Sequence, residues 1–137
     1  MEPQAALVKT LDALLEKRAN NDLRKDGLTL SQIGMLLACQ EAGGSCTLKQ
    51  LERILKLSQP TVAGTAKRLE AKGLLLGSTD PDDGRVKRVR LSDAGADCCV
   101  ISRTRMRETN EQLVSGFTPR EQQEFSRLLE KAIQNCS

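Results

Sequence analysis

A run of polar and basic side chains from Ser58 to Lys72 has the spacing that contact with nucleic acid requires. In a helix, where successive residues turn by about 100°, Pro60, Gly64 and Lys67 fall on one face. Small and polar side chains with basic groups toward one end suit contact with base edges and phosphates in the major groove. The candidate contacts in this run are Ser58, Gln59, Pro60, Thr61, Gly64, Lys67 and Arg68.

A second basic group follows the turn sequence Asp80-Pro81-Asp82-Asp83-Gly84. This composition predicts a tight turn that places Arg85 at the tip of a hairpin. An arginine there suits the minor groove, whose negative potential attracts it. Lys87 follows in the returning strand together with Arg88 and Arg90, and imperfect alternation leaves open which of them face DNA. We expect one of the aspartates to orient Arg85 through an ion pair; a solvated charged hairpin is the alternative.

Positive charge is concentrated on this part of the chain. Residues 47–95 hold ten Lys or Arg and six Asp or Glu, a net charge of +4, whereas the whole chain of 137 residues carries +3. A basic segment of this kind is what phosphate contact requires. Because the sequence has no histidine, no nucleophile motif and no glycine-rich phosphate loop, an enzyme is the least favoured class.

Capping sequences mark the helices that are expected to position these groups. Thr29-Leu30-Ser31-Gln32 and Thr47-Leu48-Lys49-Gln50 have the form of capping boxes. The first opens a helix that runs to the Gly43-Gly44 break and is apolar on most sides, so we expect it to be buried. The second opens a helix over residues 47–55, and the two-residue turn Lys56-Leu57 joins it to the basic run.

The helix of the basic run begins with favourable residues. Ser58 is a suitable N-cap, and Pro60 suits the first turn, where an N–H has no intrahelical partner. In the helix interior Gly64 costs about 1 kcal/mol relative to Ala, and close approach either to DNA or to another helix would explain it. The apolar face is expected to pack on the preceding helix, with Val62, Ala66 and Leu69 against Leu51 and Leu55.

Helix, tight turn, capped helix and basic hairpin together predict a winged helix-turn-helix, mainly α with a small β-hairpin wing. Long amphipathic helices flank it, one before the winged lobe of residues 29–95 and two after it. They lie within residues 1–24 and 96–137, and the last begins at the cap Thr118-Pro119-Arg120-Glu121. The chain is short enough for one domain, yet these helices carry more apolar surface than a small winged lobe can cover. We therefore expect the flanking helices to form a homodimer interface.

The five cysteines have neither metal-site nor disulfide spacing. Their number is odd, no C-x-x-C pair occurs and histidine is absent, so we expect reduced thiols that act mainly as packing residues. Cys46 stands just before a predicted helix N-terminus, where the helix dipole can lower its pKa. Cys98 and Cys99 open the first helix after the wing. These three are candidate redox residues, with a small inert side chain as the alternative for each.

Three motifs carry a resemblance to a known family. They are Ser-Gln-Pro-Thr-Val at residues 58–62, Arg68-Leu69-Glu70-x-Lys72-Gly73-Leu74-Leu75, and Asp80-Pro81-x-Asp83-x-Arg85 ending in Val89-Arg90-Leu91-Ser92-x-x-Gly95. With the order of elements, they resemble the MarR family of bacterial transcriptional regulators over nearly the whole chain. The resemblance implies a triangular homodimer with interlocked terminal helices, whose two winged lobes bind a pseudo-palindromic operator in double-stranded DNA. It implies Ser58 to Lys72 as the recognition helix and Arg85 as the wing arginine. No cofactor is expected.

The resemblance also implies a repressor that a small phenolic or other aromatic ligand, or thiol oxidation, releases from DNA. The chain departs from the family pattern at three positions: Glu52 replaces a usual Ala, Lys56 a common turn Gly, and Asp82 a first wing Arg. Redox members of the family use a cysteine near the N-terminus with tyrosines around it. Here no cysteine precedes Cys39 and no tyrosine is present, so that peroxide mechanism does not transfer.

Three functional hypotheses are carried forward. The favoured one is a ligand-responsive dimeric repressor; the second is a thiol- or metal-responsive regulator of the same fold, and the third is a helical interaction adaptor that does not bind DNA. No apolar run approaches the roughly 18 residues of a membrane span, and the acidic start Met1-Glu2-Pro3 is not a signal peptide. A cytoplasmic location is therefore expected.

Overall fold

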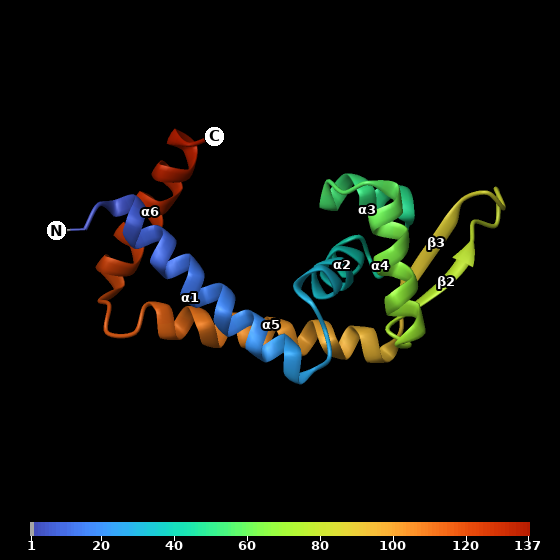
Figure 1. Cartoon of the computed structure of the whole chain (residues 1–137), viewed down its shortest axis with the longest axis horizontal. Helices are drawn as coiled ribbons and strands as arrows, with labels where there is room; N and C mark the ends of the chain where they lie inside the picture. The colour runs from blue at the N-terminus through green and yellow to red at the C-terminus, as the bar shows by residue number, and fades with distance from the viewer. Residues whose placement is uncertain (1) are drawn as a thin grey trace. The chain divides into compact units, whose positions relative to one another are not determined.

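The structure, a computed structural model, describes residues 2–137, which are mainly helical (Figure 1). In chain order the elements of these residues are α1 (Gln4–Lys25), α2 (Leu30–Glu41), β1 (Ser45–Thr47), α3 (Leu48–Leu55), α4 (Gln59–Ala71), β2 (Leu75–Thr79), β3 (Lys87–Leu91), α5 (Asp93–Leu113) and α6 (Pro119–Asn135). Helices α3 and α4 with the β2–β3 hairpin form the predicted winged helix-turn-helix, and the fold prediction is confirmed.

The wing is an antiparallel sheet of three strands in the order β1-β3-β2. The sequence predicts the β2–β3 hairpin but not β1, whose three residues pair with β3 from Ser45 opposite Arg90 to Thr47 opposite Arg88. Thr47 ends β1 and caps α3. The base of the wing is therefore attached directly to the first helix of the motif.

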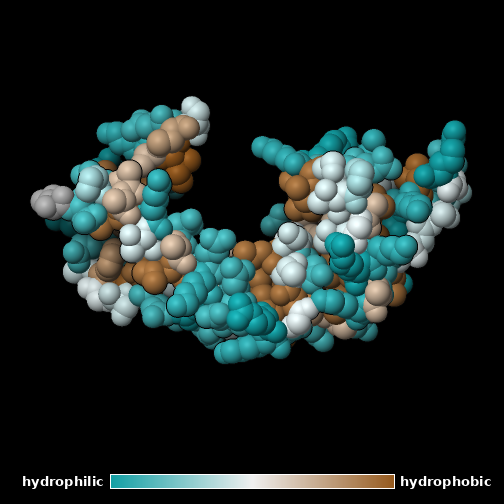
Figure 2. All heavy atoms as spheres, in the orientation of Figure 1, coloured by the Kyte–Doolittle hydropathy of each residue, from teal (hydrophilic) through white to brown (hydrophobic). Residues whose placement is uncertain are grey.

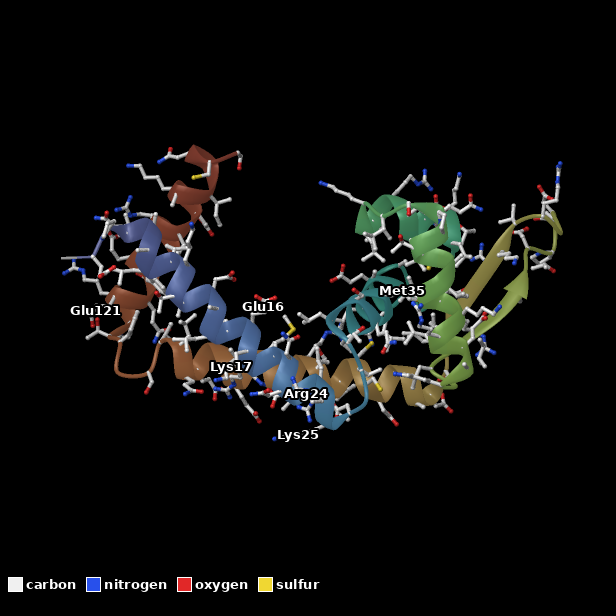
Figure 3. All side chains as sticks on the ribbon, viewed as in Figure 1. Glu16, Lys17, Arg24, Lys25, Met35 and Glu121 are labelled. Atoms are coloured by element: carbon white, nitrogen blue, oxygen red, sulfur yellow. The ribbon has the colours of Figure 1, made fainter. Side chains whose placement is uncertain are left out.

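Helix α2 lies at the centre of the core, as its apolar composition predicts. Met35, Leu36 and Cys39 have no exposed surface, and Met35 lies on α2 near α4 (Figure 3). Helix α2 packs on α3, α4 and β3. Fully buried side chains from these neighbours complete the core, namely Leu51, Val62, Leu69 and Cys46.

The predicted helix starts are present as reciprocal hydrogen bonds. In each box the backbone N of the third helical residue donates to the threonine Oγ1, and its side-chain oxygen accepts from the threonine N. The two distances are 3.1 and 3.2 Å for Thr29 and Gln32, 3.1 and 2.7 Å for Thr47 and Gln50, and 3.1 and 2.9 Å for Thr118 and Glu121. At the C-terminal end of α1, Arg24 and Lys25 lie in the last turn, where the helix dipole stabilises positive charge (Figure 3).

A close approach joins the start of α5 to the end of α4. A Cβ on Gly95 would lie 2.1 Å from the carbonyl oxygen of Leu74, so only glycine fits without a shift of backbone. The Ser92 hydroxyl accepts from Gly95 N at 3.0 Å and donates to the Gly73 carbonyl at 2.6 Å. The first turn of α5 is thus fixed to the segment between α4 and β2.

The chain divides into two compact units at Arg103 and Thr104, within α5. In the first unit, α1 and the start of α5 expose large apolar side chains: Leu7, Val8, Leu14, Val100 and Ile101. In the second, Phe117 and Phe125 pack edge to face with centroids 5.6 Å apart, while Leu128 and Ile133 remain exposed. Hydrophobic residues reach the visible surface of α6 (Figure 2). Among residues 2–137, none of the helices has the length and apolar character to cross a membrane.

Candidate nucleic-acid interface

Helix α4 has one buried and one exposed face, divided as the sequence predicts. Val62, Ala66 and Leu69 are buried, and they belong to the same core as buried Leu51 and partly buried Leu55 of α3. The other candidate face is open to solvent and consists of Ser58, Gln59, Pro60, Thr61, Lys67 and Arg68, with Gly64 half-buried among them. The packing of α4 on α3 therefore leaves its polar, basic side available to a partner.

Ser58 does not cap α4 with its side chain, contrary to prediction. It occupies the N-cap position with an extended backbone, but its hydroxyl makes no hydrogen bond to the backbone of the first turn. Instead the Ser58 Oγ and Thr61 Oγ1 atoms lie 2.9 Å apart and share a hydrogen bond. The Ser58 side chain therefore accepts no hydrogen bond from the first-turn N–H groups of α4. The hydrogen-bonded hydroxyls of Ser58 and Thr61 are exposed at the N-terminus of the helix.

Gly64 is open to solvent space rather than pressed against another helix. A Cβ at this position would meet only Nη1 of Arg68, at 3.9 Å, within the described chain. Of the two explanations left open by the sequence, close helix packing within the chain is therefore not the reason for this glycine. The Arg68 guanidinium instead lies beside it on the exposed face.

The turn between α3 and α4 is made by a residue in the left-handed region. Lys56, at φ 55° and ψ 45°, is the only residue other than glycine with positive φ among residues 2–137. Its N–H donates to the Glu52 carbonyl, as does the Leu57 N–H at 3.2 Å, so the turn closes α3 tightly. The substitution of Lys for a turn Gly places this strain at the centre of the helix-turn-helix.

Arg85 lies at the wing tip and is held by one aspartate, as expected. Asp83 Oδ1 accepts from Arg85 N at 3.0 Å and from Arg85 Nε at 3.3 Å. The Arg85 side chain is 93% exposed. A second such turn precedes it, in which Asp80 Oδ1 accepts from Asp82 N at 2.9 Å. The acidic loop thus shapes the hairpin and directs the arginine, rather than neutralising it by burial.

Two basic residues of β3, Arg88 and Lys87, have different surroundings. Arg88 pairs across the hairpin with Asp80 at 3.5 Å and donates to the Ser45 hydroxyl at 3.5 Å. These contacts within the wing occupy its guanidinium. Lys87 is exposed and lines both grooves between the wing and the helices. Arg88 also lines the larger groove, but its ion pair and hydrogen bond within the wing make exposed Lys87 the better candidate for an external contact.

Two grooves bring the helix and wing residues together. One, of about 840 Å³, lies between α4 and the sheet and includes Gly64, Lys67 and Lys87. The other, of about 390 Å³, includes Gln59 of α4 with Arg85 and Lys87 of the wing. Ser58, Pro60, Thr61 and Arg68 line neither groove.

The grooves also include residues that are not among the predicted DNA contacts. Lys49 and Glu52 of α3 line the smaller groove, and Ser78 and Thr79 of β2 line the larger one. Lys49 and Glu52 are three residues apart and so share a helix face. The Thr47 capping box predicts α3, and the three-residue spacing within that helix is the sequence signal that places Lys49 and Glu52 on the same face.

The three redox candidates lack a lowered pKa. Cys46 is fully buried in β1, and burial raises its pKa, so the predicted lowering by a helix N-terminus is wrong. Burial likewise raises the pKa of Cys99, which is fully buried, and of half-buried Cys98. Cys39 has its pKa raised from 9.0 to about 12 by burial, then by the neighbouring Cys46. Among residues 2–137, no group of three or more His, Cys, Asp or Glu is arranged to hold a metal ion.

Known proteins resemble this chain in sequence over most of its length. A profile described as MarR family matches residues 26–86. The HTH-type transcriptional regulator YwoH of Bacillus subtilis is 31% identical over 121 residues, covering 88% of this chain and 87% of its own. The regulator YxaD of the same organism is 29% identical over 116 residues, covering 85% of this chain and 76% of its own. Both relatives are described as HTH-type transcriptional regulators.

Solved structures share the fold over nearly the full chain. A mutant of MepR from S. aureus superposes with a TM-score of 0.86 at 20% identity, covering 99% of this chain and 100% of its own. The S. aureus MepR–DNA complex superposes with a TM-score of 0.78 at 22% identity, covering 98% of this chain and 99% of its own. The organohalide-sensing transcriptional regulator RdhR, in a 2,4-dichlorophenol-bound form, has a TM-score of 0.76 at 21% identity, covering 98% of this chain and 82% of its own. At these identities the likeness concerns the fold alone.

Proposed function

We propose a specific mode of operator binding for this chain, which belongs to the MarR family of winged helix-turn-helix, DNA-binding transcriptional regulators. The chain acts as a homodimer on a pseudo-palindromic site in double-stranded DNA. Each protomer places α4 in the major groove, and each wing reaches the adjacent minor groove with Arg85. The two half-sites lie about one helical turn, on the order of 34 Å, apart.

The exposed face of α4 is the observation that carries this proposal. Its apolar side is used completely in the core, whereas the side with Gln59, Lys67 and Arg68 is turned to solvent. Side chains at the start of a recognition helix contact base edges, and basic ones contact phosphates. Gly64 lets the helix backbone approach the groove floor because no side chain of this chain fills the space above it, apart from the Arg68 guanidinium.

The wing adds a second contact beside the helix. Arg85 is extended into solvent at the hairpin tip, and Asp83 holds its backbone and Nε. An arginine in this position enters a narrow minor groove, where the negative potential is strongest. Lys87, on the groove side of β3, neutralises a phosphate between the two grooves of the DNA.

Exposed apolar side chains support the homodimer. Leu7, Val8 and Leu14 of α1 are each more than half exposed, and so are Met106 of α5 and Ile133 of α6. Burying a side chain of this size contributes about 1.5–3 kcal/mol. A second copy of the chain, placing the same helices against these, covers them with a self-complementary interface.

The proposed regulator represses transcription and is released by a small aromatic ligand in the bacterial cytoplasm. A ligand-bound form of a protein with the same fold, RdhR with 2,4-dichlorophenol, supports this class of inducer. The thiol-responsive alternative is less well supported, because Cys46 and Cys99 are fully buried and their pKa values are raised. The adaptor alternative predicts no salt-dependent DNA binding.

The test measures affinity against salt concentration. The probe is a duplex that the purified protein selects from random-sequence DNA. Affinity should fall steeply with salt, and Lys67→Met should flatten the logarithmic slope by about one unit because one phosphate contact is lost. Lys25→Met, which removes a charge from the end of α1, is the control and should leave the slope unchanged. Absent or salt-insensitive binding by the wild type would favour the adaptor.

A further inference from the structure

Lys72 is a basic residue of the recognition segment that bonds inward, to another part of the protein. It is the C-cap residue of α4. Its Nζ donates to the Gly27 carbonyl and to Gln32 Oε1, the latter at 3.0 Å. These partners are 45 and 40 residues away in sequence, so the contact connects separate elements. In sequence Lys72 is a third positive charge after Lys67 and Arg68, but its ammonium group donates hydrogen bonds to acceptors within the chain.

The acceptors of Lys72 lie where the end of α1 meets the start of α2. Gly27 follows Asp26, the C-cap of α1. Gln32 is buried, and its Oε1 already accepts from Thr29 N in the capping box of α2. The lysine therefore contacts one oxygen in the connection between the two helices and one on the first turn of α2. Hydrogen bonds from an ammonium group are stronger than neutral ones and are sensitive to acceptor placement.

The contact ties the far end of α4 to the helix that leads into the expected dimer interface. The opposite end of α4 carries Gln59 and Pro60, which approach the bases in the proposed complex. A small rotation at the Lys72 end therefore shifts the reading end of the helix. In the proposed homodimer α1 belongs to the interface, so the position of its last turn would set where α4 stands relative to the other protomer.

We propose that Lys72 is a positioning residue that sets the separation of the two recognition helices, through its bonds to Gly27 and Gln32. The inference rests on the dimeric operator binding proposed above. Lys72 contacts no phosphate; it makes the protein selective for one half-site spacing. Movement of α1 relative to its partner, as a bound ligand would cause, reaches α4 through the same contact.

Operators of altered spacing test this role. The selected duplex is rebuilt with one base pair added or removed between its half-sites, and affinity for the three duplexes is measured by fluorescence anisotropy at several salt concentrations. Lys72→Met keeps the length of the side chain and removes its donors. It should reduce the wild-type preference for the native spacing by roughly tenfold, in the range of coupling energies carried by such contacts. Its salt slope should match that of the wild type.

Two matched variants separate positioning from other roles. Lys67→Met, five residues earlier on the same helix, should flatten the salt slope and keep the spacing preference. Lys72→Arg retains donors within reach of both oxygens and should keep the preference. Lys72→Gln serves as the second neutral variant if Lys72→Met does not fold, as judged by circular dichroism.

The outcomes are distinguishable from those that test the proposed function. If the wild type does not bind DNA with salt dependence, the proposed function fails. If it binds, but Lys72→Met or Lys72→Gln keeps the wild-type spacing preference, the positioning role is wrong. A salt slope flattened by about one unit in these variants also overturns it, because Lys72 would then contact a phosphate. Loss of preference in Lys72→Arg, with its donors intact, counts against it as well.

Discussion

A single carboxylate oxygen of Asp83 fixes both the backbone and the side chain of Arg85. Asp83 Oδ1 accepts from Arg85 N at 3.0 Å and from Arg85 Nε at 3.3 Å. With the arginine side chain 93% exposed, the pair contributes little to stability. The pair instead orients the Arg85 side chain, because it limits the conformations of the wing tip in the absence of DNA.

Arg85→Ala should weaken binding chiefly on A·T-rich flanks, where the minor groove is narrow. We expect a loss of roughly tenfold there and a much smaller one on G·C-rich flanks. The measurement is a titration of two duplexes that share their half-sites and differ only in flanking sequence. Equal losses on both duplexes would contradict minor-groove insertion and would indicate a phosphate contact.

Asp83→Ala should reduce the flank preference while leaving the overall affinity unchanged or raised, because an acidic group near the phosphates is removed. Asp83→Asn retains an oxygen that can accept from Arg85 N and should keep most of the preference. The same pair of duplexes measures both variants. If Ala and Asn behave alike, the hydrogen bond to the backbone does not orient the arginine.

Lys56→Gly should stabilise the fold. Lys56 has φ 55° and ψ 45°, a conformation that disfavours any residue with a Cβ. Glycine adopts it freely, so the free energy of unfolding should rise by about 1 kcal/mol, part of the gain being offset by the greater freedom of glycine in the unfolded chain. Denaturant unfolding measures the change. Lys56→Ala, which loses the charge but keeps the Cβ, is the control and should show no such gain.

Stability should fall in alkaline solution through the buried thiol of Cys39. Burial raises its pKa from 9.0 to about 12, so the folded chain holds this proton more tightly than the unfolded chain. The resulting stabilisation is complete below pH 9 and is lost as the pH rises toward 12. Urea unfolding at several pH values should show a decline that is smaller in Cys39→Ala, whereas Cys136→Ala, which alters an exposed thiol, should follow the wild type. Identical slopes in all three proteins would contradict this.

The sequence predicts those features of the fold that arise within a few residues. The capping boxes at Thr29, Thr47 and Thr118 form as expected because both partners lie within one helical turn. The division of α4 into a buried and an exposed face follows from helical period alone. The tip position of Arg85 follows from the turn composition.

Features that depend on distant segments were not predictable in the same way. Strand β1 has only three residues and exists because β3 pairs with it. Cys46 is buried in that strand, so its pKa is raised, whereas its position before a helix N-terminus suggested that the pKa could be lowered. For Ser58 a competing local partner, the Thr61 hydroxyl, replaces the backbone cap. Lys72 looks like its basic neighbours in sequence, and only the folded contact with Gly27 and Gln32 distinguishes it.

Hydroxyl-radical footprinting of the selected duplex tests the central claim most directly. If two copies of the chain place α4 in successive major grooves with Arg85 alongside, each strand should show two protected regions related by two-fold symmetry. Their centres should lie about one helical turn apart, at a stoichiometry of two protomers per duplex. Protection of one half-site by a single protomer, or uniform protection without symmetry, would contradict the account.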